Sequence, residues 1–222
     1  DLPLFRERLS KKRAAMTATF ENPTGNNHNF FGGLQGANAI AILAGLGDEE
    51  TYTNLVKRYR TLGKLDTGIF GTEAVPQVLF ANGDGKLAAE LLASTEDGTF
   101  DHWRRLGATT LWEYWPGDIK DRSHSHPMFG AAAAFLFSEL AGIHGETPGY
   151  RELRIQPVLF DGVTQLSCSQ IIPAGRVTVE YVREGDKISF KITIPGDTQA
   201  KLVFDGEETF LYSGENVVSK KL

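Results

Sequence analysis

The chain has 222 residues, a formal net charge of −5 and 41% hydrophobic residues, a composition typical of a folded globular protein. Its acidic balance argues against a nucleic-acid partner, although a basic stretch runs from Arg6 to Arg13. The single cysteine, Cys168, excludes an intrachain disulfide framework, and no apolar run reaches the roughly eighteen residues that a membrane span needs. The first residues carry neither a signal-peptide pattern nor a methionine, so we expect a piece of a longer polypeptide and infer no compartment.

The first two-thirds of the sequence is predicted to be helical. Small and apolar residues fill 29–44, which predicts a helix that is buried on nearly all sides. Asp48 follows as the N-cap of a second helix, whose apolar residues recur at i, i+3, i+4 and i+7 spacing as far as Leu62. Short loops between such helices favour antiparallel helix pairs.

Further helices follow along the chain. Helical spacing returns at 75–79 and 87–92 on either side of a turn at 82–85, and a tryptophan-rich loop comes next. The clearest helical pattern covers 129–140, with Gly142 ending the helix. Its expected packing face consists of Phe129, Ala132, Ala133, Leu136, Phe137 and Leu140.

The period of the sequence changes from 3.6 to 2 after residue 147. Alternating residues predict strands at 176–182, 187–194 and 200–204, with Gly-containing turns between them. About six short strands indicate a small antiparallel β-sandwich. We therefore expect a helical domain over 1–147 and a sandwich over 148–222.

The tryptophan-rich loop is the first candidate for chemistry. Trp112 and Trp115 flank Glu113, and aromatic rings beside a carboxylate can stack on a sugar and accept its hydroxyl hydrogen bonds. Desolvation between the rings is expected to raise the pKa of Glu113 towards a useful acid–base value. The alternative is that the tryptophans are core anchors and Glu113 caps a helix.

Three other segments are candidates with plainer alternatives. His124 and His126 precede the final helix and can face one cleft or lie on the surface, whereas a metal site there lacks a third ligand. Phe70 lies between two glycines that either allow a close backbone approach to a ligand or form a tight turn. The segment Asn26-Asn27-His28 lines a pocket or caps the first buried helix.

A resemblance to a known family rests on consecutive motifs over roughly residues 25–160. These motifs resemble those of the bacterial α-L-rhamnosidases of glycoside hydrolase family 78, and Gly-Ala-Thr-Thr-x-Trp-Glu is the most specific of them. They are Leu65–Thr72, Val78-Leu79, Asn82-Gly83, Gly107–Glu113, Ser123–His126 with Phe129-Gly130, Leu140–Ile143, Pro148–Tyr150 and Ile155–Pro157.

The resemblance implies an (α/α)6 toroid with its active site in the mouth of the ring, followed by the sandwich. It implies hydrolysis of terminal α-linked rhamnose with inversion, with Glu113 as the general base. His126 resembles a sugar ligand of the −1 subsite with Trp112 nearby, although Ser125 replaces the family's usual Asn. Trp115 and Phe70 complete the expected substrate-binding set, and no cofactor and no metal ion are implied.

The family's general acid lies in an Asp- and Arg-rich segment upstream of the Gly-Ala-Thr-Thr motif, and nothing before Gly25 resembles that segment. We therefore expect this chain to be the C-terminal part of an enzyme and to contain half of a toroid. We expect a carbohydrate substrate and no membrane partner. Half of a toroid would leave an apolar face of the helix at 29–44 uncovered. We expect the chain to pair with the upstream half, to self-associate or to be a cleavage product.

Two other functions fit the same residues. The first is an (α/α)6 hydrolase or phosphorylase that acts on another terminal sugar. The second is a carbohydrate-binding or structural module without catalysis, in which the tryptophans stack on the sugar and Glu113 only forms hydrogen bonds, because one base cannot carry out both proton transfers.

Overall fold

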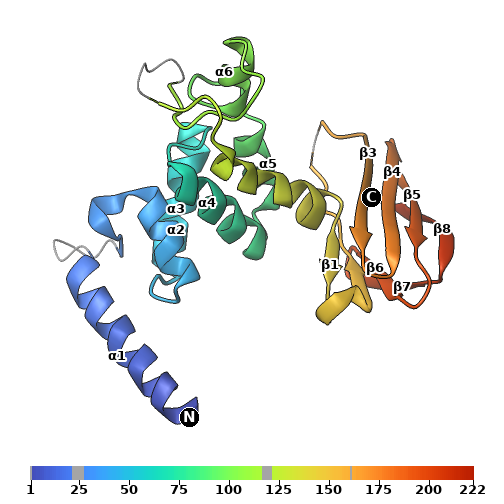
Figure 1. The fold of residues 1–222 in the computed structure, drawn as a ribbon, viewed down its shortest axis with the longest axis horizontal. Helices are drawn as coiled ribbons and strands as arrows, with labels where there is room; N and C mark the ends of the chain where they lie inside the picture. The colour runs from blue at the N-terminus through green and yellow to red at the C-terminus, as the bar shows by residue number, and fades with distance from the viewer. Residues whose placement is uncertain (1, 22–27, 117–121, 161) are drawn as a thin grey trace. The chain divides into compact units, whose positions relative to one another are not determined.

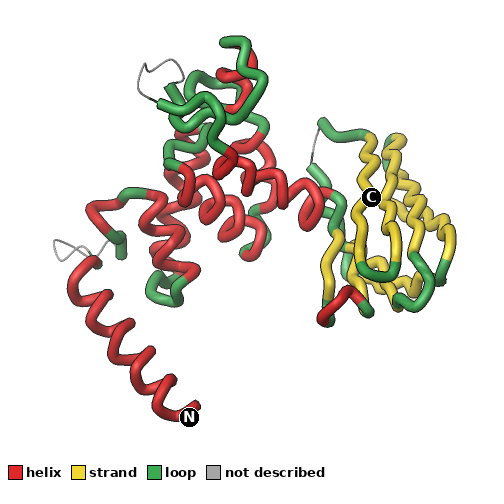
Figure 2. Tube along the Cα trace, viewed as in Figure 1, coloured by secondary structure: helices red, strands yellow, loops and turns green. Residues whose placement is uncertain are grey.

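The chain folds into two units, one helical and one built from strands (Figures 1 and 2). The helical unit is Asp1–Ala132 and the strand unit is Ala133–Leu222. None of the helices in the described part of the chain has the length and apolar content of a membrane span. A computed structural model of the chain describes residues 2–21, 28–116, 122–160 and 162–222.

The helical unit is held together by consecutive helices that pack on one another. Helix α4 contacts both α2 and α5, and α3 contacts α2. Leu55, Val75 and Leu79 are fully buried between them. The described α-helices are α1 (Leu2–Phe20), α2 (Gln35–Leu43), α3 (Glu49–Leu62), α4 (Ile69–Ala81), α5 (Gly85–Leu92) and α6 (Phe100–Arg105).

Helix α3 confirms the predicted N-cap. The Asp48 carboxylate accepts a hydrogen bond from the Thr51 N–H at 2.9 Å, and the Thr51 hydroxyl oxygen accepts one from the Asp48 N–H at 3.2 Å. This reciprocal pair satisfies two donors that a helix start otherwise leaves unpaired. The predicted stripe is also confirmed, since Leu55, Val56 and Tyr59 are buried.

The helix expected over 29–44 is shorter, and the expectation that it is buried on nearly all sides is wrong. Gly32 and Gly33 have φ values of 69° and 86°, a left-handed conformation that glycine tolerates and that interrupts a helix. Helix α2 therefore begins only at Gln35. Ile40 and Leu43 on α2 are 49% and 45% exposed, so an apolar face lies uncovered within the described residues. The association expected from this face stays a prediction.

The packing face expected over 129–140 is also wrong. The segment begins with a 3₁₀ helix, η2 (Pro127–Ala133), and ends with a π-helical turn, η3 (Leu136–Leu140). Phe129 and Phe135 are buried, whereas Leu136 and Phe137 are exposed. Between the two phenylalanines lie only glycine and alanine, which offer no large side chain to fix an α-helical register.

Two helices lie where the sequence pattern predicted none. Helix α6 occupies part of the expected tryptophan-rich loop, and the Thr99 hydroxyl oxygen caps it by accepting a hydrogen bond from the His102 N–H at 3.3 Å. Helix α1 has no buried residue. It contacts the rest of the unit through the Arg13 Nε–H, which donates to the carbonyl oxygen of Ala44 just after α2 at 3.0 Å, and through the Phe20 ring, which stacks on Phe31 at 4.6 Å.

The strand unit is a sandwich of two four-stranded sheets, with strand orders β1-β2-β6-β7 and β3-β4-β5-β8. The three strands expected from alternation are confirmed as β4, β5 and β6. The expected number of about six strands is too low, since the described residues form eight, and β2 pairs with β6 in parallel. The predicted domain boundary at residue 147 lies between β1 and β2. The strands are β1 (Ile143–Gly145), β2 (Glu152–Ile155), β3 (Gln165–Ile172), β4 (Gly175–Glu184), β5 (Lys187–Ile194), β6 (Gln199–Phe204), β7 (Glu207–Leu211) and β8 (Gly214–Lys221).

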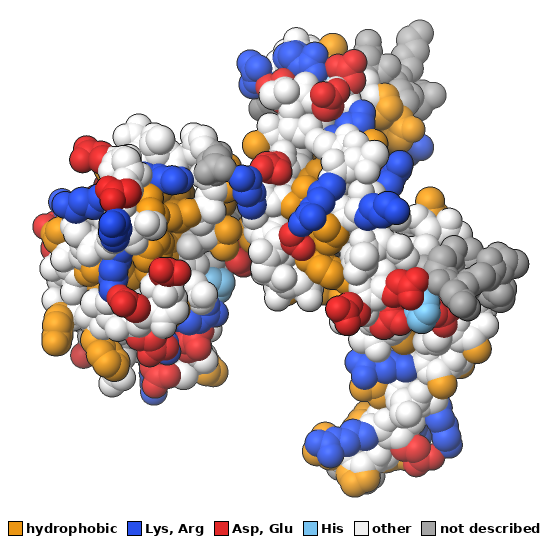
Figure 3. All heavy atoms as spheres, turned by 180° about the vertical axis from the view of Figure 1, so that it is seen from behind, with side chains coloured by type: hydrophobic (Ala, Val, Ile, Leu, Met, Phe, Trp, Pro, Cys, Tyr) orange, Lys and Arg blue, Asp and Glu red, His pale blue; other side chains and the backbone are white. Residues whose placement is uncertain are grey.

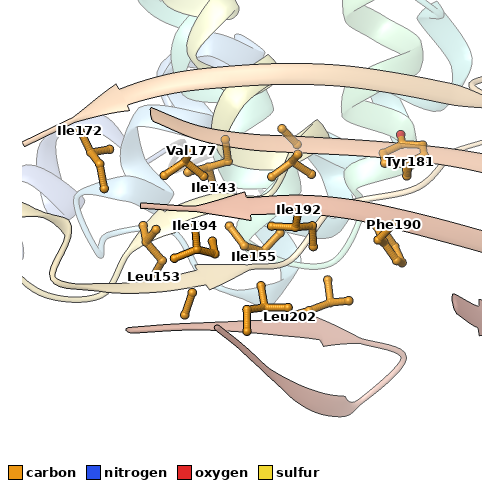
Figure 4. Close-up of a cluster of buried hydrophobic side chains, with 14 of the residues drawn as sticks. Ile143, Leu153, Ile155, Ile172, Val177, Tyr181, Phe190, Ile192, Ile194 and Leu202 are labelled. Carbon is orange, nitrogen blue, oxygen red and sulfur yellow. The ribbon is translucent and has the colours of Figure 1, made fainter. Parts of the chain in front are cut away.

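Alternating residues of the two sheets form the core of the sandwich (Figure 4). Leu153 and Leu202 come from one sheet, and Val177, Phe190 and Ile192 from the other; each is at most 2% exposed. Residues between them point outward, as the two-residue period of a strand requires. On the face drawn in Figure 3, Lys and Arg side chains are interspersed with Asp and Glu side chains in both units.

Candidate active site

Two segments on either side of residues 117–121, which lie outside the described residues, meet around Glu113. The Glu113 N–H donates to the Ser123 carbonyl oxygen at 2.9 Å, and the His126 N–H donates to the Leu111 carbonyl oxygen at 2.7 Å. The Thr110 hydroxyl donates to the His124 carbonyl oxygen. These backbone contacts bring the Gly-Ala-Thr-Thr-x-Trp-Glu motif beside the histidine-containing segment, as the family resemblance implied.

The Glu113 carboxylate is anchored through both of its oxygens. Oε2 accepts a hydrogen bond from the Ser123 N–H at 2.9 Å, and Oε1 lies 3.1 Å from Nη1 of Arg122. The Ser123 N–H, followed by the Arg122 guanidinium, lowers the pKa of Glu113 below its ordinary value, and the charge of nearby His126 acts in the same direction. The expectation that desolvation raises this pKa is therefore wrong, because hydrogen bonds to the charged form outweigh burial of a side chain that is 29% exposed.

The two histidines have different environments. The imidazole of His124 stacks on the Trp112 ring, with 4.2 Å between centroids and 11° between planes. His126 is half-buried, and its Nδ1 is buried without a hydrogen-bond partner among the described residues. An unpaired buried nitrogen is unfavourable, so Nδ1 of His126 is a candidate for a hydrogen bond with a polar ligand.

A cluster of aromatic rings packs beside the Glu113 segment. Trp103 stacks on Trp115 at 4.7 Å, and Phe129 packs edge-on against both rings. The Trp103 Nε1–H donates to the carbonyl oxygens of Tyr114 and Trp115, each at 3.1 Å. Trp112 also belongs to this cluster. The alternative that the tryptophans anchor the core therefore describes Trp103 and Trp112, which are buried, and Trp115 packs against them as a partly buried ring.

Phe70 lies in a separate hollow at the start of α4. Its side chain is 67% exposed, and it lines a volume of about 400 Å³ together with Phe31, Leu34 and Thr67. The hollow adjoins the aromatic cluster, because the Trp115 Nε1–H donates to the Thr67 carbonyl oxygen at 2.6 Å. A Cβ added at Gly71 would lie 2.5 Å from Cβ of Thr67, so this glycine permits internal packing rather than an approach to a ligand.

The segment Asn26-Asn27-His28 is only partly described, since Asn26 and Asn27 lie outside the described residues. His28 lies at the start of α3, where its Nδ1 is 2.5 Å from Oδ2 of Asp48. Within the described ranges, no group of three or more His, Cys, Asp or Glu residues is arranged to hold a metal ion.

The contact between Arg122 and Glu113 was not predicted from the sequence. The one sequence feature that could have indicated it is the position of Arg122 as a basic residue directly before the Ser-His-Ser-His segment.

Comparison with known families places this geometry in context. The family model of the bacterial alpha-L-rhamnosidase 6 hairpin glycosidase domain matches residues 1–140. The chain belongs to the bacterial α-L-rhamnosidase family. The model of the bacterial alpha-L-rhamnosidase C-terminal domain matches residues 142–219, so the resemblance expected from the motifs is confirmed.

Curated members of the family match most of this chain. Two proteins of Formosa agariphila, each named alpha-L-rhamnosidase, are 25% identical over 167 residues and 29% identical over 188 residues. The matches cover 71% and 78% of this chain but only 18% and 20% of those proteins. The chain thus spans about a fifth of the length of these α-L-rhamnosidases.

Solved structures of α-L-rhamnosidases share the fold. The Streptomyces avermitilis alpha-L-rhamnosidase complexed with L-rhamnose matches all of this chain with a TM-score of 0.88 at 20% identity, and the match covers 24% of that protein. The native enzyme from Aspergillus terreus matches 98% of this chain with a TM-score of 0.87 at 21% identity and is itself covered over 27%. The expected fold class, part of a helical toroid followed by a β-sandwich, is confirmed.

Proposed function

We propose that the protein containing this chain is a glycoside hydrolase that releases terminal α-L-rhamnose with inversion, and that Glu113 is its general base. The observation that carries this proposal is the placement of an ionised carboxylate beside His126, whose buried Nδ1 has no partner among the described residues. A lowered pKa keeps Glu113 in the form that can accept a proton. Its two hydrogen bonds leave further lone pairs for a water molecule.

The proposed reaction divides its two proton transfers between two carboxyl groups. Glu113 takes a proton from a water molecule, whose oxygen attacks the anomeric carbon from the face opposite the leaving group. A carboxylic acid on the other side protonates the glycosidic oxygen as the bond to the anomeric carbon breaks. Inverting enzymes hold the two carboxyl groups about 6.5–9.5 Å apart. We place the acid on a part of the protein outside this chain, which spans about a fifth of its curated relatives.

We assign the binding residues according to their contacts. Nδ1 of His126 forms one hydrogen bond with a sugar hydroxyl, as donor or as acceptor, and this bond satisfies the buried nitrogen. Trp112, close to Glu113 in sequence, borders the bound sugar. Trp115 does not contact the sugar directly in this assignment. It packs against the aromatic cluster that contains Trp112 and so holds Trp112 in place. Phe70 supplies an exposed ring for a more distant part of the glycoside.

The test of this function uses the complete protein. We expect hydrolysis of an aryl α-L-rhamnoside and no comparable hydrolysis of aryl α-L-arabinoside, α-D-mannoside or β-D-glucoside. Proton NMR during the first minutes should show β-L-rhamnose forming before mutarotation, because one displacement inverts the anomeric carbon. Faster hydrolysis of another glycoside would show that rhamnose is not the preferred sugar. Initial formation of the α-anomer would contradict a single displacement.

Replacing Arg122 by Gln is expected to move the acidic limb of the pH–activity profile to higher pH. The base must be ionised, and Arg122 helps to hold the pKa of Glu113 below its ordinary value. Without the guanidinium this pKa rises, so activity is lost earlier as the pH falls. The measurement is kcat/KM against pH for the complete protein, with exposed Arg151 replaced by Gln as the control. An unchanged acidic limb would contradict the role of Glu113 as the titrating base.

A further inference from the structure

The strand unit contains a hollow that is separate from the Glu113 site. It measures about 650 Å³ and is formed around the β6–β7 hairpin and the start of β2. All of its residues belong to the strand unit, so its geometry does not depend on how the helical unit is placed. The residues that carry the argument are Glu146, Glu152, Thr198, Lys201, Phe210 and Tyr212.

Two aromatic side chains stand exposed at this hollow. Phe210 on β7 and Tyr212, which follows the end of β7 at Leu211, are each 76% exposed, and both line the hollow. The backbone of Tyr212 is fixed by Asn216, whose amide oxygen accepts from its N–H and whose amide nitrogen donates to its carbonyl oxygen, both at 2.8 Å. The Tyr212 ring is therefore carried on an ordered backbone, so that only its side-chain rotamers have to be fixed on binding.

A buried hydroxyl without a partner lies in the lining of the same hollow. Thr198 is only 8% exposed, and its Oγ1 is buried without a hydrogen-bond partner among the described residues. Burial of an unpaired hydroxyl is unfavourable unless a ligand or water completes its hydrogen bond. This hydroxyl points to a polar ligand rather than to a purely apolar one.

The charged residues of the hollow are largely neutralised by neighbours. The Glu146 carboxylate pairs with Nε of Arg154 at 2.8 Å, and the Lys201 ammonium pairs with Oε1 of Glu208 at 2.6 Å. Glu152 adds a negative charge at the rim. This arrangement offers acceptors and donors for hydroxyl groups but no excess positive charge for an anionic ligand.

We propose that this hollow is a second carbohydrate site, which binds a neutral glycan outside the catalytic centre. The rings of Phe210 and Tyr212 stack on the C–H faces of pyranose units, while Thr198 and the flanking carboxylates bind hydroxyl groups. Lys201 pairs directly with Phe210 across the β6–β7 ladder, which places a donor beside the first ring. The proposal goes beyond hydrolysis and does not depend on the role of Glu113.

Affinity electrophoresis of the 222-residue chain tests this site. The gels contain a neutral L-rhamnose polymer, a galactomannan or dextran, and at least one of these should retard the chain. Phe210→Ala and Tyr212→Ala should each weaken the binding about threefold to tenfold, and the double variant should abolish it. Tyr212→Phe should keep most of the binding because it preserves the ring.

Two further variants separate ligand binding from a structural role. Thr198→Val should weaken retardation without lowering the unfolding midpoint, because it removes a hydroxyl that has no internal partner. A control variant, Ile171→Ala with Val217→Ala, removes exposed apolar side chains from the opposite sheet and should migrate like the parent chain. Glu113→Gln should also be retarded normally, which separates this site from the proposed catalytic one.

Three results would overturn the proposal. The first is the absence of retardation in all three polysaccharides, and the second is retardation that survives in the double aromatic variant. The third is a dimer, seen by light scattering, that disappears when Phe210 and Tyr212 are replaced, because the exposed rings would then serve a protein–protein contact.

Discussion

The complete enzyme should lose about 10²–10⁴-fold in kcat when Glu113 is replaced by Gln, because that is the usual contribution of a positioned general base. The amide preserves the shape of the side chain, and its oxygen can still accept the Ser123 N–H. The charge needed to take a proton from water is lost. Since the change acts on the chemical step, KM should change much less than kcat. Steady-state kinetics on an aryl α-L-rhamnoside measure both.

The control for this experiment is Glu90→Gln, an exposed position on α5, which should leave kcat unchanged. Thermal unfolding of both variants should match the parent protein. Turnover by Glu113→Gln close to the parent value would favour a module in which Glu113 only forms hydrogen bonds. A large rise in KM with unchanged kcat would assign Glu113 to binding.

A smaller variant at the same position can separate the base from a structural group. Glu113→Ala leaves a space in which azide ion can approach the anomeric carbon, and azide attacks without first losing a proton. We therefore expect azide to restore part of the activity and to form β-L-rhamnosyl azide, with the aglycone leaving as the alcohol. Failure of azide at every concentration, with the protein still folded, would count against a base at this position.

Trp103→Ala should destabilise the helical unit by about 3–5 kcal/mol, the usual effect of removing a large buried aromatic side chain. Trp103 is 2% exposed and contacts Trp112, Trp115, Phe100 and Phe129. Its removal opens a cavity and deletes the indole N–H that binds two backbone carbonyls near Glu113. In the 222-residue chain all three tryptophans lie between residues 103 and 115, so tryptophan fluorescence of this chain during urea unfolding reports on the helical unit.

The matched control removes an aromatic ring that is exposed. Phe70→Ala should change the unfolding free energy by no more than about 0.5 kcal/mol. A Trp103→Ala protein with an unchanged urea midpoint would show that the aromatic cluster does not stabilise this unit. If Trp103→Ala folds, it should also lose activity, since Trp112 and the Glu113 segment rest against the cluster.

Sequence periodicity predicted the elements whose packing lies within the chain. The stripe on α3 and the alternation of β4, β5 and β6 are each buried against neighbours that this chain supplies. Helix α1 has no buried residue and no apolar stripe, and its contacts through Arg13 and Phe20 involve exposed side chains, so its good helix-forming residues were its main signal. The face expected over 129–140 failed because several apolar residues there stay exposed.

The candidate site was predictable in its residue types but not in its electrostatics. Glu113 and His126 were predicted from the resemblance to the family's motifs, and backbone pairing brings their segments together. The direction of the Glu113 pKa was wrong, because composition shows aromatic neighbours but not the Ser123 N–H that binds the carboxylate. The hollow of the strand unit was not predicted from the sequence. Phe210 and Tyr212 lie beside the β6–β7 hairpin, and no sequence pattern indicates that this hairpin pairs with β2.

The parallel pairing of β2 with β6 bears on how the protein emerges from the ribosome. Leu153 and Ile155 are synthesised before strands β3, β4 and β5 of the second sheet, and their parallel partner strand β6 follows only after these three. At about 5–20 residues per second, the nascent β2 waits on the order of seconds with its apolar face unsheltered. A chaperone that recognises short apolar strands would therefore find its binding window during translation of β3 to β5, and slower codons there would lengthen it.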